Sequence, residues 1–170
     1  FFGEFGNTVG QLLVTRDDFD DEERRRNLHN TFMKLFEYGA IPVVNENDSV
    51  AVEEIVFGDN DSLSAHVAKL VEADALVILT DIDGLFSSNP REDESARLIS
   101  SVDRITDEIL ALAGGSGTSR GTGGMVTKLH AGEIATVAGI DTVVMNGSDP
   151  EDIYKLLDGR QIGTHFKAQR

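Results

Sequence analysis

The sequence contains no cysteine, so it has no disulfide framework, and a reducing cytoplasm is the default compartment that we expect. Long apolar runs are missing as well. Uninterrupted runs such as "ALVIL" at 75–79 are far shorter than the roughly 20 residues that span a bilayer. We therefore expect no segment that crosses a membrane.

Basic residues are scarce relative to acidic ones. The chain has 15 lysines and arginines against 30 aspartates and glutamates, which gives a formal net charge of -15 at pH 7. Such a charge repels the phosphates of nucleic acids and the surface of anionic lipids. We expect neither nucleic acid nor a membrane as a partner, and any phosphorylated ligand needs a local concentration of positive charge.

Several common catalytic patterns are also absent. No Gly-Lys-Ser/Thr follows a glycine-rich loop, and no strand runs directly into glycines, which excludes a Walker-type loop and a dinucleotide fingerprint. Neither a Ser-His-Asp order nor the paired carboxylates of glycosidases can be argued. The histidines lack metal-ligand spacing, and we interpret all four as packing or surface residues: His29, His66, His130 and His165.

What is present is the composition of an ordinary globular domain, with 170 residues, 40% hydrophobic and 26% charged. Short β-branched runs alternate with segments of helical periodicity, which favours an α/β fold with a mainly parallel sheet. Neither an internal repeat nor a linker divides residues 1–170, so we expect a single domain. The pattern predicts strands at 10–15, 41–45, 75–80 and 141–146 and an extended segment at 162–166. It predicts helices at 17–38, 62–73, 106–114, 125–138 and 150–157.

Two finer expectations concern burial and a polar connection. The run at 75–80 has the most apolar composition of the expected strands, so we place it at the centre of the sheet. The connection after the strand 41–45 contains "VEEIVF" (52–57), which is compatible with a small hairpin.

Residues 114–124, "GGSGTSRGTGG", contain six glycines in eleven positions and lead into the helix that carries Lys128. Glycines let backbone N–H groups approach a phosphate closely, the helix N-terminus adds partial positive charge, and the lysine adds a full charge. Together these features predict an anion site. A flexible connector is the alternative reading of the same glycines.

Three further polar clusters stand at the ends of expected elements. "VNENDSV" (44–50) and "LTDIDGLF" (79–86) each come at the carboxyl end of a strand, where open α/β sheets bind ligands. "FGDNDSLSA" (57–65) precedes a helix, where Asp61 or Ser62 could simply be the N-cap. Turn formation is the alternative for the first two. Because the clusters belong to one edge of the expected sheet, we predict that they form a common site.

These strings resemble signatures of the amino acid kinase family. "LTDIDGLF" with "NPR" (89–91) and "GTGGMVTKLHAG" (121–132) are similar to motifs found across the family, which includes kinases of aspartate, acetylglutamate, carbamate and UMP. "IPVVNENDSV" (41–50) with "GDNDSLSA" (58–65) is similar to the branch that phosphorylates the γ-carboxylate of glutamate. The resemblance runs from about Gly10 to Phe166.

The resemblance implies a three-layer α/β/α sandwich and a role for individual residues. Lys128 matches the lysine that neutralises the transferring phosphoryl group, and Asp61 matches the aspartate that orients catalytic lysines. Asp59 is expected near the metal or the lysines. The positions matching glutamate contacts are Asn45, Asp48 and Asn60. The positions matching nucleotide contacts are Thr80, Asp81, Thr122, Gly123, Gly124, Met125, Val126, Thr127 and Lys128.

The resemblance also implies the reaction and its partners. ATP is the co-substrate with Mg²⁺, and the product is the γ-glutamyl phosphate that begins proline biosynthesis. A homo-oligomer and feedback inhibition by proline are implied in the same way. The γ-carboxylate of glutamate has a pKa of about 4.3, so it is an ionised nucleophile at neutral pH and needs no general base. The remaining task is to hold two anions in line and to absorb charge on the γ-phosphoryl oxygens.

One departure from the family concerns the start of the chain. Family members begin with a strand that carries a Lys-Leu-Gly or Lys-Gly-Gly phosphate loop, followed by a Ser-Gly-Ala substrate loop, and neither is present here. The first residue is Phe1, and we expect an upstream segment to be missing and these 170 residues alone to be inactive. Two alternatives stay open: a related kinase with another carboxylate or carbamate acceptor, and a non-catalytic binding or regulatory module of the same fold.

Overall fold

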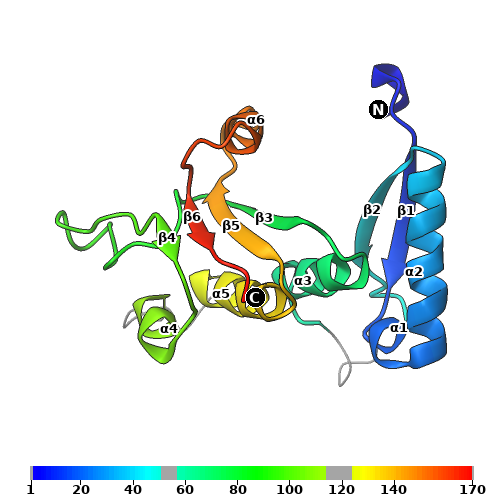
Figure 1. The fold of residues 1–170 in the computed structure, drawn as a ribbon, viewed down its shortest axis with the longest axis horizontal. Coiled ribbons are helices and arrows are strands. Elements are labelled where there is room, and N and C mark those ends of the chain that lie inside the picture. Colours follow the sequence, from blue (N-terminus) through cyan, green and yellow to red (C-terminus); the bar gives the residue numbers. More distant parts are fainter. Residues whose placement is uncertain (1, 51–56, 114–123, 170) are drawn as a thin grey trace.

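A computed structural model describes residues 2–50, 57–113 and 124–169 of the chain (Figure 1). The strands are β1 (Val9–Val14), β2 (Ile41–Glu46), β3 (Ala75–Thr80), β4 (Ser101–Val102), β5 (Asp141–Asn146) and β6 (Thr164–Phe166). The helices are η1 (Phe2–Phe5), α1 (Asp17–Asp20), α2 (Glu22–Glu37), α3 (Asn60–Leu70), α4 (Asp107–Ala113), α5 (Met125–Val137) and α6 (Asp152–Leu157).

The described strands form two sheets. β1 and β2 pair in parallel, and α2 connects them as the crossover. The second sheet has the order β3-β5-β6-β4, in which β3–β5 and β4–β6 are parallel and β5–β6 is antiparallel. The mainly parallel α/β architecture predicted from the sequence is confirmed, with one antiparallel pair.

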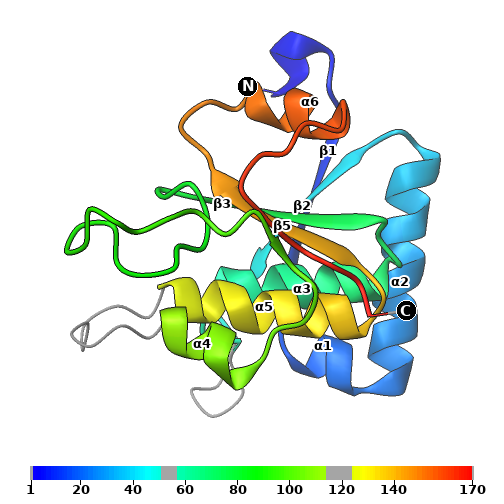
Figure 2. The ribbon, with the colours of Figure 1, turned by 60° about the vertical axis from the view of Figure 1, so that its left-hand side comes forward.

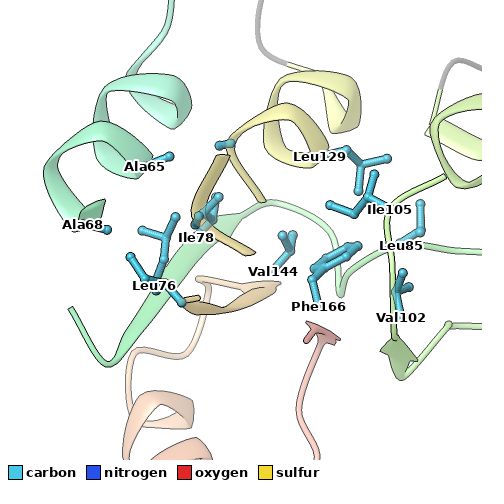
Figure 3. Packing of buried hydrophobic residues seen from close by; sticks show 13 residues of the cluster. Ala65, Ala68, Leu76, Ile78, Leu85, Val102, Ile105, Leu129, Val144 and Phe166 are labelled. Atoms are coloured by element: carbon cyan, nitrogen blue, oxygen red, sulfur yellow. The ribbon is translucent and has the colours of Figure 1, made fainter. Parts of the chain in front are cut away.

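Helices α3 and α5 lie side by side across one face of the four-stranded sheet, as Figure 2 shows from a second direction. The main core fills the space between these helices and the sheet (Figure 3). Leu129 of α5, Val144 of β5 and Phe166 of β6 are all fully or almost fully buried there. A smaller core at the C-terminal end of β1 joins Val14 and Phe19 to Leu63 of α3. The packing fixes the start of α3 against the start of α5.

The predicted helix 17–38 is wrong in one respect, because it is two helices. Asp21 interrupts it with an extended backbone (φ -77°, ψ 130°), and its side chain accepts a hydrogen bond from the backbone N–H of Arg24. The first N–H groups of a helix have no partner within that helix, and the Asp21 carboxylate satisfies one such group of α2. Asp21 therefore ends α1 and caps α2.

The expectation for the strand 75–80 is also wrong. Among the described strands, β3 lies at the edge of its sheet, and β5 is the most buried, with four consecutive buried residues from Thr142 to Met145. The cause is pairing, because β5 has a strand on each side whereas β3 has one. Most of the hairpin considered at 52–57 lies outside the described residues.

Candidate functional site

Asp61 and Lys128 meet where the first turns of α3 and α5 pack together. The Nζ of Lys128 donates a hydrogen bond to Oδ2 of Asp61 at 2.9 Å, and the two side chains are 10% and 19% exposed. The hydroxyl of Thr127 lies 2.8 Å from the same carboxylate oxygen. The structure therefore brings together, from positions far apart in the sequence, the two residues predicted to be catalytic and one predicted nucleotide contact.

Local sequence explains how α3 presents Asp61. Asp59 is the N-cap of this helix, because its carboxylate accepts hydrogen bonds from the backbone N–H of Ser62 at 2.7 Å and from the Ser62 hydroxyl at 3.0 Å. The alternative reading of the sequence, in which Asp61 or Ser62 is the N-cap, is wrong. Because the Asp59 carboxylate caps α3, the Asp61 carboxylate does not serve as the cap and accepts hydrogen bonds from Thr127 and Lys128 of α5.

The start of α5 has a different character. Its N-cap is Gly124, which offers no side chain to the first N–H groups of the helix. The hydroxyl of Thr127 can donate to the carbonyl of Gly124 at 2.8 Å or to Asp61, but its single hydrogen serves only one of them at a time. The N–H groups of a first helical turn, the positive end of the helix dipole and the Lys128 ammonium together suit an anion.

A second polar group lies where β3 and β5 end. Thr80 and Asn146 are partners in the register of these strands, and the N–H of Gly147 donates to the Thr80 carbonyl at 2.8 Å. The hydroxyl of Thr80 donates to Asp81 at 3.3 Å, and the side-chain amide of Asn146 donates to Asp83 at 2.9 Å. Asn146 was not among the residues selected from the sequence. A signal was present, because Asn146 is the last residue of an expected strand and Asp81 was selected for its similar place at a strand end.

The third group belongs to the end of β2. Asn45 is exposed and stands opposite Leu13 in the β1–β2 register, while Asp48 is exposed in the turn that follows. Asn60, the first residue of α3, lines an apolar groove of about 320 Å³ together with Val44. Asn60 is adjacent to Asp61 in the sequence, and the groove that it lines also includes Val44, the residue before Asn45.

The remaining predicted nucleotide contacts divide into two sets. Thr122 and Gly123 lie outside the described residues. In the first turn of α5, Met125 is half-buried against the main core, whereas Val126 is 37% exposed. Val126 is therefore the more accessible of these two side chains, and Met125 anchors the helix.

Two properties of the described residues bear on ligands and membranes. No group of three or more His, Cys, Asp or Glu side chains in residues 2–50, 57–113 and 124–169 is arranged to hold a metal ion. Within the same ranges, none of the helices combines the length and the apolar character needed to cross a bilayer.

Comparison with known proteins gives relatives over the whole chain. It is 50% identical over 174 residues to glutamate 5-kinase of Clostridium perfringens, a match that covers 100% of this chain and 65% of the relative. It is 51% identical to glutamate 5-kinase of Listeria monocytogenes, which covers 100% of this chain and 63% of the relative. The chain thus spans just under two thirds of these curated relatives.

Solved structures agree on the fold. A T. acidophilum isopentenyl phosphate kinase matches with a TM-score of 0.66 at 20% identity, over 96% of this chain and 62% of that one. A UMP kinase from Ureaplasma parvum matches with a TM-score of 0.64 at 14% identity, over 97% of this chain and 62% of that one. Their likeness supports the three-layer α/β/α class. Since the sequence model of the amino acid kinase family matches residues 1–146, the chain belongs to this family.

Proposed function

We propose that this chain supplies the acceptor and nucleotide regions of a glutamate 5-kinase, which transfers the γ-phosphoryl group of ATP to the γ-carboxylate of glutamate. About 50% identity to glutamate 5-kinases along the whole chain supports the substrate. The observation that carries the chemistry is the buried Lys128 ammonium, held by Asp61 at the start of α5, where the N-cap is a glycine.

In this reaction a γ-carboxylate oxygen of glutamate attacks the γ-phosphorus of ATP, the bond from that phosphorus to the bridging oxygen breaks, and ADP leaves with the electron pair. Glutamate is already ionised at neutral pH, so no proton has to be removed. The protein must instead compensate negative charge that spreads over the phosphoryl oxygens. Lys128 is the cation assigned to that task, and Asp61 is the positioning residue that keeps its ammonium in place.

The other polar residues are assigned to binding the two substrates, glutamate and ATP. Asn45, Asp48 and Asn60 are assigned to glutamate, because amide and carboxylate groups suit its α-carboxylate and ammonium. Thr80, Asp81 and the segment from Thr122 to Lys128 are assigned to ATP, whose phosphates approach the start of α5. The product, γ-glutamyl phosphate, is the first intermediate of proline biosynthesis.

Mg²⁺ fits this arrangement as an ion that arrives with the nucleotide. It keeps several waters and commonly binds through one or two carboxylates plus substrate phosphates, so a dedicated cluster of protein ligands is not required. Asp81 and Asp83 follow β3 near the proposed nucleotide position. They accept hydrogen bonds from Thr80 and Asn146, and their remaining lone pairs would hold the ion. When bound, the ion would screen the negative charge of the phosphates.

The proposal extends to the compartment, the assembly and the regulation of the enzyme. We assign the enzyme to the cytoplasm, as a homo-oligomer subject to feedback inhibition by proline.

The decisive experiment uses a chimaera in which this chain replaces the matched part of the Clostridium perfringens relative. We expect ATP-dependent formation of the glutamate hydroxamate, and little or none with aspartate, acetylglutamate or carbamate. The 170-residue chain alone, spanning under two thirds of the relatives, is expected to be inactive. A folded chimaera that prefers another acceptor would overturn the substrate assignment, and one inactive with every acceptor would favour a non-catalytic module.

A further inference from the structure

A large cavity among the described residues lies away from the candidate site. It is a crevice of about 750 Å³ between the pair α1 and α2 on one side and α3 on the other. These helices can be followed in Figure 1. Its apolar part includes Phe19, Leu70 and the ring of His66, and three cations line it: Arg25, Arg26 and Lys69. We call this cavity the cationic crevice.

The sign of these charges is unusual for the molecule. The whole chain carries a formal charge of -15, yet two arginines and a lysine converge on one cavity. Two carboxylates also line it, but Asp20 is already paired with Arg16 at 3.3 Å, which leaves Glu22. Within residues 2–50, 57–113 and 124–169, none of Arg25, Arg26 and Lys69 has an ion-pair partner. Like charges that line one cavity repel one another, and a bound anion relieves that repulsion.

The crevice also has ordered features. The Nη1 of Arg25 donates to the backbone carbonyl of Phe19 at 3.2 Å, which draws the guanidinium toward the apolar side. The ring of His66 packs on Phe57 and Phe19, with ring centroids 5.3 and 5.8 Å away. Burial, then the nearby charge of Arg16, lowers the pKa of His66, so at neutral pH this side chain is a neutral ring with one N–H donor.

We propose that the cationic crevice binds a small molecule that carries a phosphate or carboxylate group beside an apolar or aromatic part. An arginine fork can donate two parallel hydrogen bonds to a pair of oxygens in either anion. The rings of Phe19 and His66 offer a surface on which the apolar part can pack. The crevice is separate from the candidate site, because Lys69 lies eight residues beyond Asp61 on α3, about 12 Å along the helix axis.

The test titrates the 170-residue chain with three probes at constant ionic strength: phenyl phosphate, benzoate and inorganic phosphate. Backbone amide shifts are followed by NMR. We expect saturable binding with a Kd on the order of 1 mM or tighter for phenyl phosphate or benzoate, and weaker binding of inorganic phosphate. The two organic probes distinguish a phosphate from a carboxylate ligand. The shifts should gather in residues 25–29 and 66–70.

A charge-matched pair of variants controls for net charge. The double variant Arg26→Ala/Lys69→Ala should weaken binding at least tenfold. The double variant Arg91→Ala/Arg160→Ala removes the same charge at exposed positions outside the crevice and should bind as the original chain does. Neither variant removes a partner from a buried group, so circular dichroism should report folded protein in both. Equal affinity in the two variants, absence of saturation, or shifts confined to residues 124–128 would overturn the proposal.

Discussion

The ammonium of Lys128 lies 2.9 Å from a carboxylate oxygen of Asp61, and this contact joins the first turns of two helices that begin 65 residues apart. A lysine in a first helical turn faces the positive end of its own helix dipole, which is unfavourable. An aspartate in the first turn of α3 has the opposite, favourable relation to its helix. Asp61 thus offsets the cost of keeping a cation where a phosphate would gain most from it.

Replacing Lys128 by alanine in the chimaera should lower kcat by on the order of 10² or more while changing the KM for glutamate little. The reason is that Lys128 is proposed to meet charge that exists mainly in the transition state. Steady-state kinetics with ATP and glutamate measure both constants. Lys34→Ala is the control, because Lys34 is an exposed lysine paired with Glu37 on α2. An unchanged kcat would remove Lys128 from the mechanism.

The hydroxyl of Thr127 donates either to Asp61 or to the carbonyl of Gly124, and Thr127→Val removes this hydrogen bond while keeping the shape of the side chain. We expect the free energy of unfolding of the chain to fall by about 1 kcal/mol in urea denaturation. In the chimaera, kcat should fall less than in Lys128→Ala, because the ammonium remains. Thr127→Ser, which restores the hydroxyl, should recover both quantities. Loss in the serine variant without loss in the valine variant would mean that the methyl group, not the hydroxyl, matters.

The elements of this fold were predictable because their signals are local. Hydrophobic periodicity located every described helix of six residues or more within two residues at either end, apart from the longer errors at the C-terminal end of helix 62–73 and within 17–38. That second error has a local cause, because the Asp21 cap competes with a continuous helix. The sequence shows that this stretch is acidic, but it does not show which of the aspartates is the N-cap of a helix.

Pairing between distant segments was less accessible. The burial of β5 depends on β6, a three-residue strand whose pattern does not reveal that it runs antiparallel to β5. The family resemblance anticipated the meeting of Asp61 with Lys128, but the pattern of neither helix shows which element packs against it. Asn146 is the last residue of an expected strand, but the sequence does not show that this strand end lies beside Asp83, its hydrogen-bond partner.

Gly163 is a position where the fold requires glycine. Its φ is +69°, and an added Cβ would lie 2.2 Å from the carbonyl oxygen of Val144 and 2.8 Å from the Cβ of Met145. We expect Gly163→Ala to lower the free energy of unfolding by roughly 2–5 kcal/mol, from the left-handed backbone and the steric overlap together. Chemical denaturation followed by circular dichroism measures the change.

Gly159 provides the matched control for that substitution. Its φ is +83°, but an added Cβ would meet nothing within 4 Å. Gly159→Ala should therefore lower the free energy of unfolding by about 1–2 kcal/mol, the backbone contribution alone. If the two variants lost the same stability, the close approach of β5 to Gly163 would have no energetic effect.

His66 should make the stability of the chain depend on pH. Burial and the charges of Arg16 and Lys69 lower the pKa of this side chain below its ordinary value, and Asp20 opposes them in part. The unfolded chain therefore binds more protons than the folded chain between the folded pKa and about 6.5. The stabilising contribution is complete above about pH 6.5 and is lost as the pH falls through the folded pKa.

The measurement compares His66→Phe with the original chain, because phenylalanine keeps a ring against Phe19 and Phe57 but does not titrate. Thermal unfolding at several pH values between about 7 and about 5 should show a steeper loss of stability in the original chain than in the variant. Carboxylates that titrate at the lower end affect both proteins equally, so the difference isolates His66. His130→Gln, at an exposed position of α5, should keep the original slope. Identical slopes in His66→Phe and the original chain would mean that His66 is not the group that titrates.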